Sequence, residues 1–206
     1  MSSTGYWFVG TAAPETVDLL RTTVPATDFA SVPDGADLTW WQSMDQATVL
    51  APADLRYTFP SPSDAAQRFI DTLDALRPDP TALDTCLRAL SETSKQELFH
   101  VAVRKGDPVA ALYYGLGFDD ARLLPGRFGC FLLTADDVDS SLTALEHLPE
   151  RPHIGRGRFA TRATEWNAAA ADEPALDPYT LLDEPLRILR LARRQRVGVI
   201  GLMQWF

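Results

Sequence analysis

The segment that most constrains the fold lies near the C-terminus, at residues 197–203, where every residue is apolar or glycine. A short continuous apolar run, without alternating polar residues, is typical of a strand in the centre of a sheet. No apolar run in the chain approaches the roughly 20 residues that cross a bilayer. The sequence therefore predicts a protein that contains a sheet and does not span a membrane.

Hydrophobic periodicity predicts an α+β fold with a mixed or antiparallel sheet and about five helices. Within residues 63–77, Phe69, Ile70 and Leu73 recur at the intervals of three and four that place them on one face of a helix. Further helices are expected after Pro14 and at residues 80–90, 138–148 and 181–194. Strands are expected at residues 5–9, 98–103, 109–114, 128–133 and 197–203, with a hairpin turn at residues 104–108.

Local signals predict how these helices begin and pack. Thr11 is expected to cap the helix after Pro14. Thr134 and Asp137 form the pattern of a capping box, with Asp in place of the usual Glu. The helices at residues 63–77 and 80–90 are expected to form an antiparallel pair, because their connection is short.

Composition and charge limit the class of protein. Hydrophobic residues make up 46% of the chain and charged residues 23%, as in globular proteins, so we expect a single α+β domain over residues 1–206. The net charge of −9 argues against contact with nucleic acid, which requires a basic surface, and favours a basic protein partner. Residues 1–10 lack the basic start of a secretory signal, so a cytoplasmic location is expected.

The C-terminal part shows an order of motifs that is similar to a known family. A Gly-Arg segment after Pro125 is followed by the run LTADDV at residues 133–138, and then by a helix and a strand. In these features residues 125–206 resemble the YfbM-like family of uncharacterised bacterial proteins. The resemblance implies a compact α+β domain and carries over no functional residue. The proline-rich N-terminal third departs from the family's pattern.

The residue types that usually carry catalysis or bind metals are few and separated. His100, His147 and His153 have no metal-ligand spacing, so we expect no metal and no other cofactor. Cys86 and Cys130 both lie among apolar residues, which favours buried free thiols over a disulfide.

Two residues are candidates for a catalytic role, and neither is assigned one. Cys130 is the best candidate for a nucleophile, although a place in the core explains it better, because nothing near it in the sequence would lower its pKa. His100 lies in the apolar strand at residues 98–103. It could act as a base in a cleft, or it could be a hydrogen-bonded histidine in the core or at a sheet edge.

The chain also contains candidates for binding a ligand or a partner. In residues 155–159 arginine alternates with glycine, a pattern that could wrap an anion or form an ordinary solvated loop. A further helix is expected after Asp37, and it contains the adjacent Trp40 and Trp41. Two adjacent tryptophans on one helix cannot both face the same core, so one is left for a partner or for packing under the proline-rich loops. The candidates are Trp40, Trp41, Arg127, Arg156, Arg158 and Trp166.

Two functions from different classes remain open. The first is a non-catalytic protein of the immunity or accessory type, whose acidic surface and exposed aromatic residues bind a basic protein. The second is a small enzyme or binder of an anionic metabolite, with a pocket near His100, Arg127 and residues 156–158. The absence of a recognisable catalytic set favours the first. The sequence contains no signal for an oligomeric state.

Overall fold

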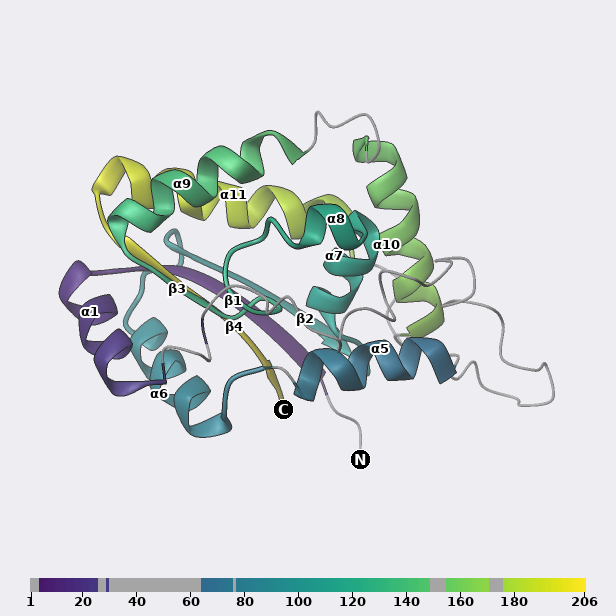
Figure 1. The fold of residues 1–206 in the computed structure, drawn as a ribbon, viewed down its shortest axis with the longest axis horizontal. Coiled ribbons are helices and arrows are strands. Elements are labelled where there is room, and N and C mark those ends of the chain that lie inside the picture. Colours follow the sequence, from purple (N-terminus) through teal and green to yellow (C-terminus); the bar gives the residue numbers. More distant parts are fainter. Residues whose placement is uncertain (1–3, 26–28, 30–63, 76, 149–154, 171–175) are drawn as a thin grey trace.

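The computed structural model describes residues 4–25, 29, 64–75, 77–148, 155–170 and 176–206. These residues form an α+β fold in which helices pack against a four-stranded antiparallel sheet (Figure 1). The strands are β1 (Thr4–Ala12), β2 (Leu98–Arg104), β3 (Phe131–Leu133) and β4 (Gly198–Trp205). The helices are α1 (Pro14–Thr23), α5 (Asp64–Ala75), α6 (Pro80–Ser91), α7 (Pro108–Leu116), α8 (Phe118–Ala121), α9 (Ala135–Glu146), α10 (Arg156–Ala170) and α11 (Pro178–Gln195).

The strand order is β2-β1-β4-β3, and all neighbouring strands are antiparallel. β1 and β4 therefore occupy the centre of the sheet. The prediction of a central strand at residues 197–203 is confirmed, because residues 198–203 of β4 are all buried. An antiparallel strand that is covered on both faces needs apolar residues on both, which explains the continuous apolar run.

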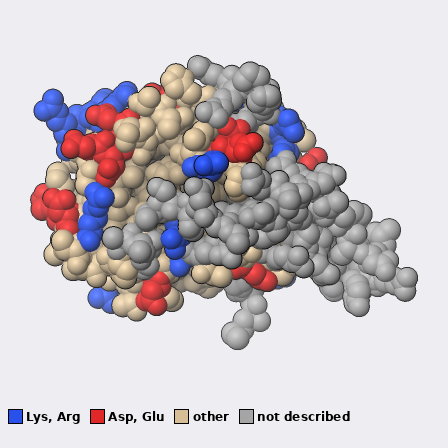
Figure 2. Space-filling view, viewed as in Figure 1, with Lys and Arg blue, Asp and Glu red and all other residues tan. Residues whose placement is uncertain are grey.

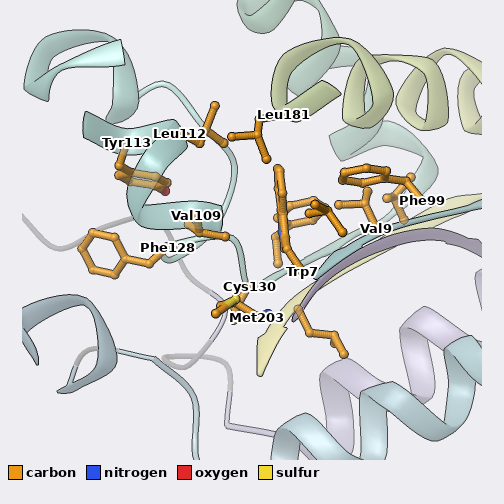
Figure 3. Close-up of a cluster of buried hydrophobic side chains, with 14 of the residues drawn as sticks. Trp7, Val9, Phe99, Val109, Leu112, Tyr113, Phe128, Cys130, Leu181 and Met203 are labelled. Carbon is orange, nitrogen blue, oxygen red and sulfur yellow. Dashed lines mark hydrogen bonds between the residues drawn. The ribbon is translucent and has the colours of Figure 1, made fainter. Parts of the chain in front are cut away.

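One face of the sheet packs against α7 and α11. We call it the Trp7 face, because Trp7 and Val9 of β1 point towards it. Leu112 of α7 and Leu181 of α11 line a cavity together with Trp7, and Figure 3 shows these side chains converging above the sheet. This face therefore holds part of the hydrophobic core.

The opposite face, which we call the Tyr6 face, packs against α1 and α6. Successive residues of a strand alternate between the two faces, so Tyr6 and Gly10 point to this side. A Cβ at Gly10 would lie 2.7 Å from Leu90 of α6, and one at Gly198 would lie 2.6 Å from Val17 of α1. The absence of a Cβ at these two glycines therefore leaves room for Leu90 of α6 and Val17 of α1 to pack against the strands.

Residues 109–114 form helix α7, so the predicted hairpin between two strands is wrong. Asp107 caps the helix: one carboxylate oxygen accepts hydrogen bonds from the backbone N–H groups of Val109 at 2.8 Å and Ala110 at 2.9 Å. Pro108 occupies the first turn, where a proline is favoured. Every residue of α7 is buried. A helix that is apolar on all sides has no hydrophobic period, which is why its sequence resembled a buried strand.

The predicted helices are mostly present, but some of their predicted caps and contacts are not. The capping box of Thr134 and Asp137 is present, and the helices at residues 63–77, 80–90, 138–148 and 181–194 are confirmed. Thr11 lies in β1, and Ala13 precedes α1 without a side-chain cap. The antiparallel helix pair is not formed, because α6 packs on β1 and β4 whereas α5 packs on α7.

The described residues contain eight helices rather than about five, and the additional ones are α7, α8 and α10. Phe159, Ala163 and Trp166 of α10 are buried at intervals of four and three, and α10 packs along α7. Among the described residues, no helix is long and apolar enough to cross a membrane.

Candidate functional site

The N-terminal half of β1 and the adjoining strand β2 form the part of the Tyr6 face that α1 and α6 leave exposed. Tyr6 and Phe8 of β1 are partly exposed, whereas Trp7 and Val9 between them are buried. In β2 the same alternation leaves His100 exposed. Apolar side chains that remain accessible on a sheet are candidates for an interaction surface.

Four ring side chains form one continuous group on this surface, which we call the aromatic strip: Phe206, Tyr6, Phe8 and His100. The rings of Tyr6 and Phe8 are stacked with centroids 5.9 Å apart, and Phe206, which is 59% exposed, meets Tyr6 edge-on at 5.4 Å. Phe8 stacks on His100, its cross-strand neighbour, at 6.2 Å. The strip therefore crosses from the end of β4 over β1 to β2.

The border of the aromatic strip carries an acidic side chain. Gln204 of β4 lies opposite Tyr6 and donates a hydrogen bond of 3.1 Å to the carboxylate of Asp84 on α6. Aromatic faces attract cations, and a neighbouring carboxylate adds to that attraction. The arrangement suits an arginine or lysine side chain, or an apolar one, from another molecule.

A buried ion pair lies at the end of the sheet, on the side of the Trp7 face. Arg77, which follows α5, donates to Asp107 at 2.5 Å, and the two side chains are 5% and 0% exposed. Arg77 also pairs with Asp74, which accepts a hydrogen bond from Trp205 Nε1 at 3.2 Å. Burial alone would lower the pKa of Arg77, but the two carboxylates raise it on balance, so the arginine stays charged. This cluster of charged side chains therefore links α5, α7 and β4.

Neither cysteine has the environment of a nucleophile. Both are buried free thiols, as expected from the sequence. Burial raises the pKa of Cys130 to about 11 and that of Cys86 to about 12, so both are protonated near neutral pH. Cys130 lies in the core, where its sulfur accepts a hydrogen bond of 3.4 Å from the backbone N–H of Met203.

Residues 155–159, expected to form either an anion-binding segment or a solvated loop, instead lead into helix α10, which begins at Arg156. Arg156 donates to Asp183 of α11 at 2.5 Å, and its guanidinium lies 5.1 Å from the centroid of the Tyr179 ring. Arg156 therefore joins α10 to α11. Arg158 is an exposed residue in the first turn of α10.

The other sequence candidates lie in different places. Trp166 is 1% exposed and packs edge-on against Phe69 of α5 at 5.3 Å, so it belongs to the core. Arg127 lies in the turn before β3, where its backbone pairs with that of Cys130. Trp40 and Trp41 lie outside the described residues.

The structure does not bring the predicted pocket residues together. His100 points to the Tyr6 face, whereas Arg156 belongs to α10, which packs on α7 and α11 beyond the Trp7 face. A cavity of about 30 Å³ does lie on the Trp7 face, but its lining contains no charged side chain. The described residues also contain no group of His, Cys, Asp and Glu side chains able to hold a metal.

Figure 2 shows basic side chains gathered at the upper left of the view, with acidic side chains beside them. Over the rest of the described surface in that view, acidic and basic residues are interspersed.

Comparisons with protein-family models, curated proteins and solved structures found no match to this chain. The resemblance of residues 125–206 to the YfbM-like family therefore stays a prediction.

Sequence reasoning missed the aromatic strip, although part of the signal was visible. In residues 5–9 two aromatic residues, Tyr6 and Phe8, alternate with Trp7 and Val9. All four side chains are apolar, so the alternation shows which residues share a face of the strand but not which face other elements cover. Phe206 lies three residues beyond the strand predicted at residues 197–203, so nothing in the sequence placed it beside Tyr6.

Proposed function

We propose that this protein has a binding role of the immunity or accessory type, and that it recognises a basic segment of another protein through the aromatic strip. The observation that carries the proposal is the continuous group of four rings, in which Phe206 and His100 are exposed and Tyr6 and Phe8 are partly buried. Aromatic residues left accessible on a rigid sheet are typical of the centres of protein interfaces.

The charge of the chain supports a basic partner. A net charge of −9 attracts a cationic segment and accelerates its encounter with the protein. Once the partner is bound, arginine or lysine side chains can lie over the rings of Tyr6 and Phe8, near the carboxylate of Asp84. Nucleic acid bases also stack on aromatic rings, but an acidic chain repels the phosphates that accompany them.

The placement of the catalytic candidates favours binding over catalysis. Cys130 is buried and protonated, and His100 is an exposed residue of an edge strand that stacks on Phe8. Arg156, the arginine expected to bind an anion, is paired with Asp183. The alternative function, action on an anionic metabolite, therefore has less support than protein binding.

The proposal is tested with the tagged chain as bait in extracts of its own source cells. The test variant is Tyr6→Thr combined with Phe8→Thr, since threonine keeps the strand propensity while both rings are removed. The control variant is Leu19→Gln, which removes another exposed apolar side chain, 62% accessible, from helix α1. Far-UV circular dichroism and the Tm establish that both variants are folded.

The expected result is one basic protein captured in stoichiometric amount by the wild type and by Leu19→Gln, and lost with the double variant. The Kd of the purified complex should rise with ionic strength, because part of the attraction is electrostatic and is screened over about 8 Å at 0.15 M salt. Equal capture by all three baits would contradict the proposal, and so would the absence of any stoichiometric partner.

A further inference from the structure

The outer edge of β2 presents backbone groups that β1 does not use. The backbone N–H of Thr11 donates to the carbonyl of Glu97 at 3.0 Å, and the register of β1 and β2 places these two residues opposite each other. In an antiparallel ladder, every second residue of a strand forms hydrogen bonds to the same neighbouring strand. Phe99, Val101 and Val103 therefore bond to β1. The N–H and C=O groups of the residues between them, above all His100 and Ala102, point away from the sheet.

This edge lacks the features that usually prevent strands from pairing. Its register with β1 runs over seven consecutive pairs without a bulge, and β2 contains no proline. The charged residue of β2, Arg104, stands at its end. Among the residues that the structure describes, no other strand pairs with β2 on this side. A long, regular edge of this kind is a template for a further strand.

The sequence around β2 is complementary to itself in an antiparallel arrangement. An acidic residue, Glu97, precedes the strand, and a basic residue, Lys105, follows it. When two copies pair with Val101 on the two-fold axis, Glu97 of each copy comes to the same end of the paired strands as Lys105 of the other. Both residues lie in turns just outside β2, and the Glu97 carboxylate accepts hydrogen bonds from Ser94 and Gln195. In the same register the larger side chain of His100 lies opposite the small Ala102, and both residues direct their backbone groups at the other copy.

We propose that two copies of this chain associate through antiparallel pairing of their β2 strands, with Val101 on the two-fold axis. The axis is perpendicular to the sheet, so the two four-stranded sheets become continuous and the two Tyr6 faces lie on the same side. The aromatic strips of the two copies then approach each other at His100. The association is isologous, as in most homodimers.

The proposal is tested by sedimentation equilibrium of the full chain over a range of protein concentrations. The salt concentration is kept at or above about 0.15 M, so that repulsion between two copies of net charge −9 is screened. The test variant is Ala102→Pro, which removes an outward N–H and leaves the ladder to β1 intact, because an edge strand tolerates proline on its outer side. The control is Ala102→Thr, which keeps that N–H.

The wild type and Ala102→Thr should form dimers, and Ala102→Pro should raise the Kd of the dimer by roughly thirtyfold or more. Two hydrogen bonds are lost at once, because each substitution occurs twice in the dimer. Circular dichroism and the Tm establish that the proline variant is folded. A monomeric wild type would overturn the proposal, and so would a folded Ala102→Pro variant that dimerises as tightly as the wild type.

A second measurement tests the register and separates this proposal from the proposed function. Glu97→Lys brings a second basic side chain to each end of the paired strands, near Lys105 of the other copy, so it should raise the Kd of the dimer more than the neutral Glu97→Gln does. Equal effects of the two substitutions would contradict the register. The strip variant Tyr6→Thr with Phe8→Thr should still dimerise, so loss of partner binding and loss of dimerisation have different readouts.

Discussion

Replacement of Arg77 by methionine should destabilise the fold strongly, because it leaves the carboxylate of Asp107 buried without its cation. Removing one partner of a buried ion pair typically costs about 3–5 kcal/mol. The lower end applies here, since Asp107 keeps its two hydrogen bonds to the backbone of α7 at 2.8 and 2.9 Å. We expect a loss of about 3 kcal/mol in the free energy of unfolding. For a domain of this size the Tm falls by roughly 6–12 °C.

Asp107→Asn provides the matched control for this prediction. Asparagine retains a side-chain oxygen that can accept the same two hydrogen bonds and cap α7, but it carries no charge. In the double variant Arg77→Met with Asp107→Asn, no unpaired charge is left in the core. The double variant should therefore be more stable than the sum of the single effects by about 2 kcal/mol, which is a coupling energy within the range for contacting residues.

The assay is urea unfolding followed by tryptophan fluorescence, with the Tm measured independently by calorimetry. The two substitutions form a double-mutant cycle, so the coupling energy is obtained directly. A loss below about 0.5 kcal/mol for Arg77→Met, or additive single effects, would refute the reasoning. Either result would mean that the ion pair is hydrated and does not fasten α5 to α7.

Three further predictions concern other parts of the molecule. Partial burial raises the pKa of Asp137, but its hydrogen bonds with Thr134 and its contact with Arg21 lower this pKa on balance. The ionised Asp137 carboxylate therefore stabilises the fold above its ordinary pKa. This stabilisation is lost as the pH falls through the pKa of Asp137 in the folded protein. Asp137→Ala should reduce the free energy of unfolding by about 0.5–1 kcal/mol near pH 7 and have almost no effect near pH 2, measured by urea titration. The thiol of Cys130 should react with a disulfide reagent only after unfolding, and rapid reaction of the native protein would contradict its burial. Gly10→Ala should lower stability by about 1–3 kcal/mol, because the new Cβ meets Leu90 at 2.7 Å; an unchanged Tm would show that α6 can shift.

Local chemistry in the sequence was sufficient for several elements. The central position of β4 followed from its apolar run, and the capping box of Thr134 and Asp137 followed from residues three positions apart. The helix at residues 181–194 followed from its hydrophobic period. Each of these signals is contained within a few neighbouring residues, so no knowledge of the partner elements was needed.

Burial by distant segments decided the elements that the sequence misassigned. α7 lacks a period because core surrounds it on all sides, and α10 begins in a glycine-arginine segment that has the composition of a loop. α10 is helical where Phe159, Ala163 and Trp166 pack against α7 and α5. Packing between elements can override local propensity in this way.

The candidate site was decided by tertiary structure alone. The sequence determined that Tyr6 and Phe8 point to one side of β1, and Trp7 and Val9 to the other. It did not determine which side is covered, because all four residues are apolar. α1 and α6 cover the Tyr6 face over Gly10 and Gly198 and leave its other end exposed. A strand carries the alternation in its own residues, but exposure depends on where helices distant in the sequence pack.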